Sequence, residues 1–310
     1  MKFDVAVVGS GLSALVATRR LQKAGRQPVL IWPGLSSLYF VYATIDVLGY
    51  ADATSTEPVD NPGKGVSKLI SSDPRHPYAR AGSPALRDGV ALMLDWLKAA
   101  GFRWQGSLDR NLLLPTATGT PKPSCLIPDS MAAGDLRRAD PMVLCGFDGY
   151  EDFVPELAAS NLESWDGNGG HVRAVRVPLP RFPAGRLVTS IDLARSFEDS
   201  DFRRAVADRI RGAASIEGSN VRLGIPGVLG LTHDTDVHSQ FQEEVGCPVF
   251  EIPTLPPSVL ALRLFDRLRK HLQETGVEII WAAPAHAAEV SAEVCRRIHL
   301  KSAGRERSIE

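Results

Sequence analysis

The strongest constraint on the fold lies at the amino end of the chain, where an apolar run stops at a glycine turn. The run F-D-V-A-V-V ends in Gly9-Ser10-Gly11, and a helical pattern begins at Leu12. In a nucleotide-binding βαβ unit the first glycine permits a tight turn and the second lets the backbone approach a phosphate. Ala14 is small enough for the helix to pack closely against the strand. Amides at a helix start favour an anion. The pattern predicts a phosphate-bearing cofactor held by Gly9, Ser10, Gly11, Leu12, Ser13 and Ala14.

The flanking sequence favours a complete βαβ unit over the alternative, a plain tight turn. A strand over 3–8, a helix over about 12–24 and a second strand over 28–32 follow in the required order. Gly25 stands where a helix-ending glycine belongs. The basic residues of the last helical turns complement the helix dipole. We therefore expect a nucleotide or flavin site at the glycine turn.

The acid that usually binds the ribose of a dinucleotide is missing. Dinucleotide sites place Asp or Glu about 20 residues past the glycines, at the end of the second strand. No carboxylate occurs between Asp4 and Asp46, and Trp32-Pro33-Gly34 fills the expected position. FMN carries a phosphate but no adenosine, so the pattern favours FMN over NAD or NADP, with Trp32 flanking the nucleotide. The alternatives are a decayed site and FAD held by other groups.

Composition restricts the possible partners. The 310 residues are enough for two domains, and 35 basic residues balance 36 acidic ones, which gives no electrostatic basis for binding nucleic acid. No apolar stretch reaches the roughly 18 residues of a membrane span. The chain enters a strand without a cleavable signal, so a cytosolic protein is expected. Four cysteines without C-x-x-C spacing predict reduced thiols and no metal site.

The middle of the chain predicts further α/β structure. An amphipathic helix is expected over 84–100 and a hairpin or meander over 112–131. A second alternation of strands and helices begins at Met142 and includes a helix over 149–164. Alternating strands and helices of this kind imply a parallel sheet with both faces covered.

The last part of the chain begins with a proline-rich turn and a long helix that extends to about residue 275. The helix carries a basic stripe of Arg263, Arg267 and Lys270, and a polar tail is expected over 301–308. The predicted fold is α/β, a Rossmann-like flavin-binding βαβ domain with a second α/β domain. Its expected parts are the flavin-binding half at 1–140, a second α/β region at 141–252, and at 253–310 the long helix with returning strands that complete the flavin domain only in part.

Four blocks of sequence resemble the B subunit of anaerobic glycerol-3-phosphate dehydrogenase. They read F-D-V-A-V-V-G-S-G-L, S-S-L-Y-F with I-D-V-L downstream, H-P-Y from His76, and P-T-L-P-P-S-V-L from Pro253 to Leu260. The spacing of the blocks also matches, so the resemblance covers essentially the whole chain. The last block is the most distinctive.

The resemblance implies a flavoprotein, with FMN as the expected cofactor and FAD as the second choice, in a complex of three subunits. The partner A subunit would carry FAD and oxidise glycerol 3-phosphate, and an iron–sulfur C subunit would anchor the complex at the inner membrane. This chain would relay electrons toward the quinone pool from the cytoplasmic side. No histidine or carboxylate stands in a motif that demands a catalytic role, so cleavage of the substrate C–H bond is assigned to the partner.

Two departures from relatives lead to a further expectation. V-Y-A-T from Val41 to Thr44 is bulkier than the Ser- and Gly-rich sequence expected beside a flavin, and relatives continue beyond Glu310 through a segment that closes over the flavin ring. The 310-residue chain alone is therefore expected to hold little flavin. The sequence leaves two alternative functions open. In these the chain would be either a non-catalytic assembly subunit with a decayed flavin site or an NAD(P)-dependent oxidoreductase.

Overall fold

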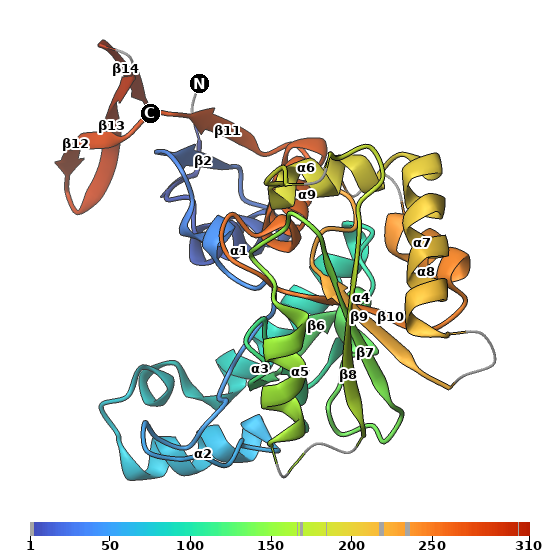
Figure 1. Cartoon of the computed structure of the whole chain (residues 1–310). Helices are drawn as coiled ribbons and strands as arrows, with labels where there is room; N and C mark the ends of the chain where they lie inside the picture. The colour runs from blue at the N-terminus through green and yellow to red at the C-terminus, as the bar shows by residue number, and fades with distance from the viewer. Residues whose placement is uncertain are drawn as a thin grey trace. The chain divides into compact units, whose positions relative to one another are not determined.

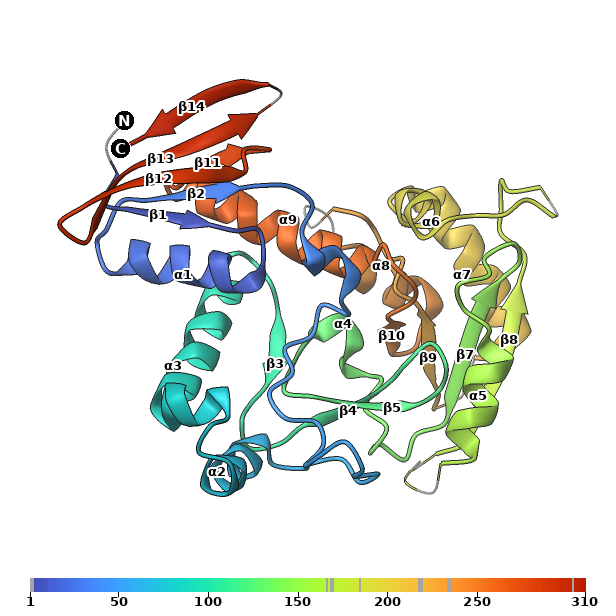
Figure 2. The ribbon, with the colours of Figure 1, turned by 90° about the vertical axis from the view of Figure 1, so that its left-hand side faces the viewer.

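The computed structural model describes residues 3–165, 167, 170–183, 185–216, 220–232, 236–302 and 304–310. The chain forms two compact units, which are drawn in Figures 1 and 2. Unit 1 combines the chain up to Tyr39 with Phe265–Glu310, and unit 2 is Phe40–Leu264. The division into 1–140, 141–252 and 253–310 stays a prediction about folding domains.

Unit 1 is built on a parallel sheet with the strand order β1-β2-β11. The glycine turn joins β1 to helix α1, as the sequence predicts. The last position of β11 pairs with the last position of β2, at Trp281 and Trp32. The elements are β1 (Val5–Val8), α1 (Leu12–Lys23), β2 (Pro28–Trp32), the 3₁₀ helix η1 (Ser37–Phe40), β11 (Glu278–Trp281) and the part of α9 (Val259–Glu274) from Phe265 onward; the first residues of α9 belong to unit 2.

The end of the chain forms a three-stranded antiparallel sheet, so the prediction of a polar tail over 301–308 is wrong. The strands are β12 (Ala285–Ser291), β13 (Val294–Ser302) and β14 (Arg305–Ile309). Leu300 and Ile309 are buried against apolar residues of β2 and β11. The first four residues of β14 are polar and exposed, yet they pair with β13, and composition alone does not reveal this pairing.

Unit 2 contains a second parallel sheet, with the order β10-β9-β7-β8. Buried phenylalanines join its helices to one another: the rings of Phe202 and Phe241 each meet the ring of Phe197 edge-on, with centroids 5.4 Å apart. The elements are β7 (Met142–Phe147), α5 (Pro155–Glu163), β8 (Val172–Val177), α6 (Ser190–Phe197), α7 (Ser200–Ala214), β9 (Arg222–Pro226), α8 (Val237–Val245) and β10 (Val249–Ile252). Two parallel sheets confirm the α/β class.

The helix predicted over 149–164 begins later than expected, at Pro155. Gly149 adopts a φ of 80°, which favours glycine and turns the chain after β7. An added Cβ there would meet the Arg186 carbonyl oxygen at 2.2 Å. The chain therefore needs a loop before α5 can begin.

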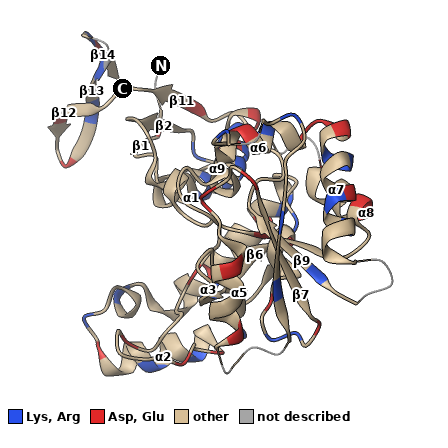
Figure 3. Ribbon diagram, in the orientation of Figure 1, with Lys and Arg blue, Asp and Glu red and all other residues tan. Residues whose placement is uncertain are grey.

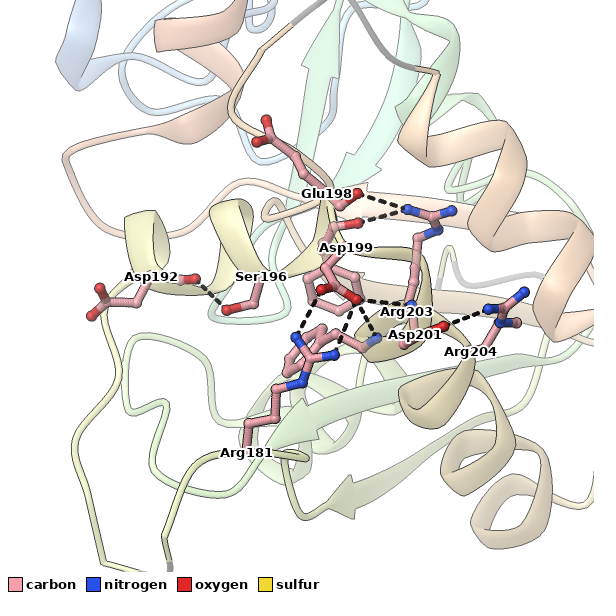
Figure 4. Close-up of polar contacts among 10 residues, drawn as sticks. Arg181, Asp192, Ser196, Glu198, Asp199, Asp201, Arg203 and Arg204 are labelled. Carbon is pink, nitrogen blue, oxygen red and sulfur yellow. Dashed lines mark hydrogen bonds and ion pairs between the residues drawn. The ribbon is translucent and has the colours of Figure 1, made fainter.

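Charged side chains fix the start of α7 in unit 2. The Asp199 carboxylate accepts hydrogen bonds from the amides of Asp201 and Phe202, and Arg181 donates to both of its oxygens (Figure 4). These contacts hold the pKa of Asp199 well below its usual range. Along α7 itself basic and acidic positions are interspersed (Figure 3), which gives its outer face no strong charge of one sign.

The remainder of unit 2 precedes β7. The strands confirm the expected meander, since β4 pairs with β5 and β3 pairs with β6, both antiparallel. The helix expected over 84–100 is the second part of α3, which breaks at Gly82 with a φ of 80°. The elements are α2 (Pro62–Ser72), α3 (Pro77–Ala99), β3 (Trp104–Gly106), β4 (Leu112–Pro115), β5 (Pro121–Ser124), β6 (Leu126–Pro128) and α4 (Asp129–Ala132).

Candidate functional site

The turn after β1 has a shape that demands glycine at its first position. Gly9 has a φ of 148°, and a Cβ added there would lie 3.1 Å from the Cβ of Ala14. Its amide donates to the Ile31 carbonyl at 2.9 Å, which ties the turn to β2. A small residue at 14 is therefore required for the same reason as glycine at 9: the helix begins against the strand end.

The space beside the Cα atom of Gly11 is empty of protein atoms. Gly11 is the N-cap residue of α1, with a φ of −83° that any residue adopts, and a Cβ added there would meet no atom within 4 Å. Among the described residues no side chain caps this helix end, and its first turn contains no acidic residue. The amides of Leu12, Ser13 and Ala14 are the ones that an α-helix leaves without intrahelical partners. The arrangement suits an anion lying over Gly11.

Ser36 is a site residue that sequence reasoning missed. Its hydroxyl donates to the Ser10 carbonyl at 2.7 Å and accepts from the Leu38 amide at 3.1 Å, and the residue is only 1% exposed. It therefore fastens the loop after β2 to the glycine turn. Its only sequence signal is its place beside the S-L-Y-F block, which says nothing about a partner 26 positions earlier.

Trp32 lies at the carboxyl end of β2 but offers little surface. It is 3% exposed, and its ring centroid lies 5.2 Å from that of Trp281, which is 41% exposed. The structure thus brings Gly9, Ser10, Gly11, Leu12, Ser13 and Ala14 together in one turn, with Trp32 at the end of the neighbouring strand. Trp281, which sequence reasoning did not select, presents the more accessible aromatic surface in this part of unit 1. Contact of Trp32 with a nucleotide stays a prediction.

The P-T-L-P-P block is anchored inside unit 2 by buried hydroxyl groups. Tyr150 is fully buried, and its hydroxyl lies 2.8 Å from that of Thr254 and 3.2 Å from that of Ser190. Burial raises the pKa of Tyr150. The network fixes the loop that follows β10, whereas Leu255, the next residue, is 59% exposed.

The basic stripe expected on α9 is engaged within the chain. Arg263 donates to both oxygens of the fully buried Glu251 carboxylate at 2.8 and 2.9 Å and to the Leu229 carbonyl at 2.8 Å. Arg267 lies 2.8 Å from Glu274. The Arg263 contacts hold the start of α9 against the loops that follow β9 and β10, so the stripe is not a free docking face.

A cavity of about 360 Å³ in unit 2 contains none of the predicted phosphate-binding residues. Its charged lining is largely paired: Arg103 donates to Asp236 at 3.0 Å and lies 3.7 Å from Asp129. His238 Nε2 lies 2.9 Å from the Val249 carbonyl, and because a carbonyl only accepts, this nitrogen carries the hydrogen. Among the described residues that line the cavity, Arg103, Asp129, Asp236 and His238 are thus engaged in contacts within the chain.

The thiols are poor redox candidates. Burial raises the pKa of Cys125 and of Cys247 to about 11, and raises that of Cys145 further. All four cysteines are free thiols, and Cys295 alone among them is exposed.

Within the described residues no group of three or more His, Cys, Asp or Glu is arranged to hold a metal ion. No helix in the described parts of the chain is both long and apolar enough to cross a membrane.

The parallel sheet, the glycine turn and the uncapped start of α1 define a nucleotide-binding protein of the α/β class. Residues 4–308 match the family described as FAD binding domain, which makes this a flavin-domain oxidoreductase. The chain belongs to the family of anaerobic glycerol-3-phosphate dehydrogenase B subunits, as the resemblance predicts.

Two relatives show the extent of the similarity. The probable B subunit of anaerobic glycerol-3-phosphate dehydrogenase from Halobacterium salinarum is 32% identical over 312 residues, which cover 97% of this chain and 70% of the relative. The B subunit of the Pectobacterium carotovorum enzyme is 27% identical over 300 residues, covering 94% of this chain and 69% of the relative. Among solved structures, 3-ketosteroid Δ1-dehydrogenase of Sterolibacterium denitrificans aligns over 99% of this chain and 46% of its own, with 12% identity and a TM-score of 0.38.

Proposed function

We propose that the chain binds a flavin nucleotide through a phosphate at the amino end of α1. The observation that carries the proposal is the combination at Gly11: an uncapped helix start and open space where a side chain would otherwise stand. The backbone amides of residues 11–14 would bind the phosphate, with the hydroxyls of Ser10 and Ser13 as secondary donors. The bound flavin would supply electron-transfer chemistry, and the protein would supply position and electrostatics.

The biological role that we propose follows from the relatives. Both are named as B subunits of anaerobic glycerol-3-phosphate dehydrogenase, which supports a role in electron transfer from glycerol 3-phosphate, as it is oxidised to glycerone phosphate, toward the quinone pool. Within such a complex an A subunit carrying FAD would oxidise the phosphate substrate. An iron–sulfur C subunit would hold the complex at the inner membrane, with this chain on the cytoplasmic side.

Two observations point to different flavins. The absence of a carboxylate at residues 32–34 favours FMN, which has no adenosine ribose to bind. The matched family, described as FAD binding domain, favours FAD. Both cofactors present the phosphate that the open position at Gly11 would accept, so the proposed phosphate site is the same for each.

Gly11→Val tests the phosphate site. Valine fits the backbone, because the φ of −83° is ordinary and no protein atom lies near the added Cβ. Its side chain would occupy the space assigned to the phosphate, so the affinity for FMN and for FAD should fall at least tenfold in a fluorescence-quenching titration while the circular dichroism spectrum stays the same.

Gly89→Val on α3 is the matched control, since an added Cβ there also meets nothing within 4 Å. It should bind flavin as the parent chain does. Equal flavin affinity in the Gly11 variant and the parent would show that the phosphate does not lie over α1.

A further inference from the structure

The cavity of about 360 Å³ in unit 2 is lined on one side by buried aliphatic side chains. These come from the start of α8, at Val237, and from the first turns of α9, at Leu260 and Leu264. The half-buried rings of Phe102 and Trp104 line it as well. Its volume lies at the lower end of the range of small-molecule sites, which is about 300–1,000 Å³. The cavity therefore has room for a molecule of one or two rings that would bury apolar surface there.

The charged side chains that line the cavity offset one another. Arg103 Nη2 lies 3.0 Å from the Asp236 carboxylate, and Arg103 Nε lies 3.7 Å from that of Asp129. The Asp236 carboxylate also caps α8 at its positive end, where it accepts a hydrogen bond from a backbone amide. The second arginine of the lining, Arg263, donates to both oxygens of Glu251. An ionised ligand would lose its hydration here without gaining an unpaired opposite charge, so the lining favours a neutral ligand.

His238 supplies the cavity with a hydrogen-bond acceptor. Its Nε2 carries the hydrogen, because it lies 2.9 Å from the Val249 carbonyl, which can only accept. In the neutral ring Nδ1 is then an acceptor, and it has no hydrogen-bond partner in the parts of the chain that the structure describes. The ring is half-buried and lines the cavity. A ligand with an O–H group can therefore donate to Nδ1.

We propose that this cavity binds an uncharged molecule of one or two rings that carries a hydroxyl group. The rings lie against Val237, Leu260 and Leu264, and the hydroxyl donates to Nδ1 of His238. The cavity shares no residue with the glycine turn after β1. Its test is therefore independent of flavin binding.

An NMR titration of the full chain with matched indane derivatives tests the proposal, because the derivatives share one two-ring body. They are 2-indanol, indane itself, protonated 2-aminoindane and indane-2-carboxylate. We expect 2-indanol to bind with a Kd below about 1 mM, a modest affinity for a ligand of its size. Indane lacks the hydroxyl and should bind about twofold to tenfold more weakly, the range for one neutral hydrogen bond. Both ions should bind more weakly than 2-indanol, and an ion that binds as tightly would overturn the proposal.

His238→Phe keeps an aromatic ring and removes the acceptor. The variant should bind 2-indanol and indane with equal affinity, and an indane affinity equal to that of the parent would show that the cavity is intact. His171→Phe is the control, because His171 is exposed and does not line the cavity, and this variant should keep the preference for 2-indanol. A preference that persists in the His238 variant would show that the hydroxyl does not bind to this ring.

Ser130→Trp tests the location of the ligand. Ser130 lines the cavity from α4, so a large ring at this position should fill the space and abolish binding of both 2-indanol and indane. Ser130→Ala is the matched control and should bind both as the parent does. Parent-like binding by the tryptophan variant would place the ligand elsewhere and refute the proposal. The proposal also fails if 2-indanol does not bind the parent chain, and neither result bears on the phosphate site at α1.

Discussion

Replacing Ser36 by alanine tests whether the loop after β2 holds the glycine turn in place. The hydroxyl donates to the Ser10 carbonyl at 2.7 Å and accepts from the Leu38 amide at 3.1 Å, and water does not reach it in a residue that is 1% exposed. Each such hydrogen bond contributes about 1 kcal/mol net, and a buried group left without its partner costs about 1–3 kcal/mol. We expect Ser36→Ala to lower the free energy of unfolding of unit 1 by about 2 kcal/mol.

Urea unfolding followed by tryptophan fluorescence measures this change, since Trp32 and Trp281, two of the five tryptophans, belong to unit 1. Ser37→Ala is the matched control, because Ser37 is the exposed neighbour. Flavin affinity should also fall in the Ser36 variant alone, because the Ser10 turn loses its fixed position. The same unfolding midpoint for the two variants would refute the reasoning.

Two further changes test the charges of unit 2. Arg263→Ala leaves the fully buried Glu251 carboxylate without its ion pair and should cost about 3–5 kcal/mol of stability, measured by urea unfolding; a loss below about 1 kcal/mol would contradict this. Asp199 has a lowered pKa in the folded state, so the unfolded state binds more protons near pH 4, and the stability that Asp199 provides is present above that pH and lost as pH falls. Asp199→Asn should therefore flatten the decline of the urea midpoint between about pH 4 and pH 2, and an unchanged decline would show that the contacts with Arg181 and the α7 amides do not stabilise the fold.

The first βαβ unit could be predicted because its information is local. Each of β1, the glycine turn, α1 and β2 carries its own pattern of apolar residues, glycines and helix ends within about thirty residues, which is the span of one such unit. Gly9 illustrates the point, since the residue type alone reports a backbone shape that only glycine adopts readily. The family resemblance then rested on blocks that are also short and contiguous.

Other features depend on pairs that are distant in the sequence. Asp266 and Tyr39 are 227 positions apart, and nothing in the sequence around either residue indicates that the two are in contact. The strand β14 was missed because its first four residues are exposed and polar, which is also the composition of a loop. Ile309 is the one residue of this strand that is buried. Gly149 was placed inside a helix because the turn that requires it is fixed by contact with Arg186, which comes much later in the chain.

The sheet of unit 1 has a consequence for the order in which the protein assembles during synthesis. Trp32 pairs with Trp281, so the ribosome must release all of unit 2 before β2 finds its second neighbour. Until then β2 has an open edge of apolar residues, a surface on which nascent chains associate wrongly. Unit 2 is one continuous stretch and can fold while it emerges. Its completion replaces a long flexible loop by a compact body, which lowers the entropy cost of bringing the two halves of unit 1 together.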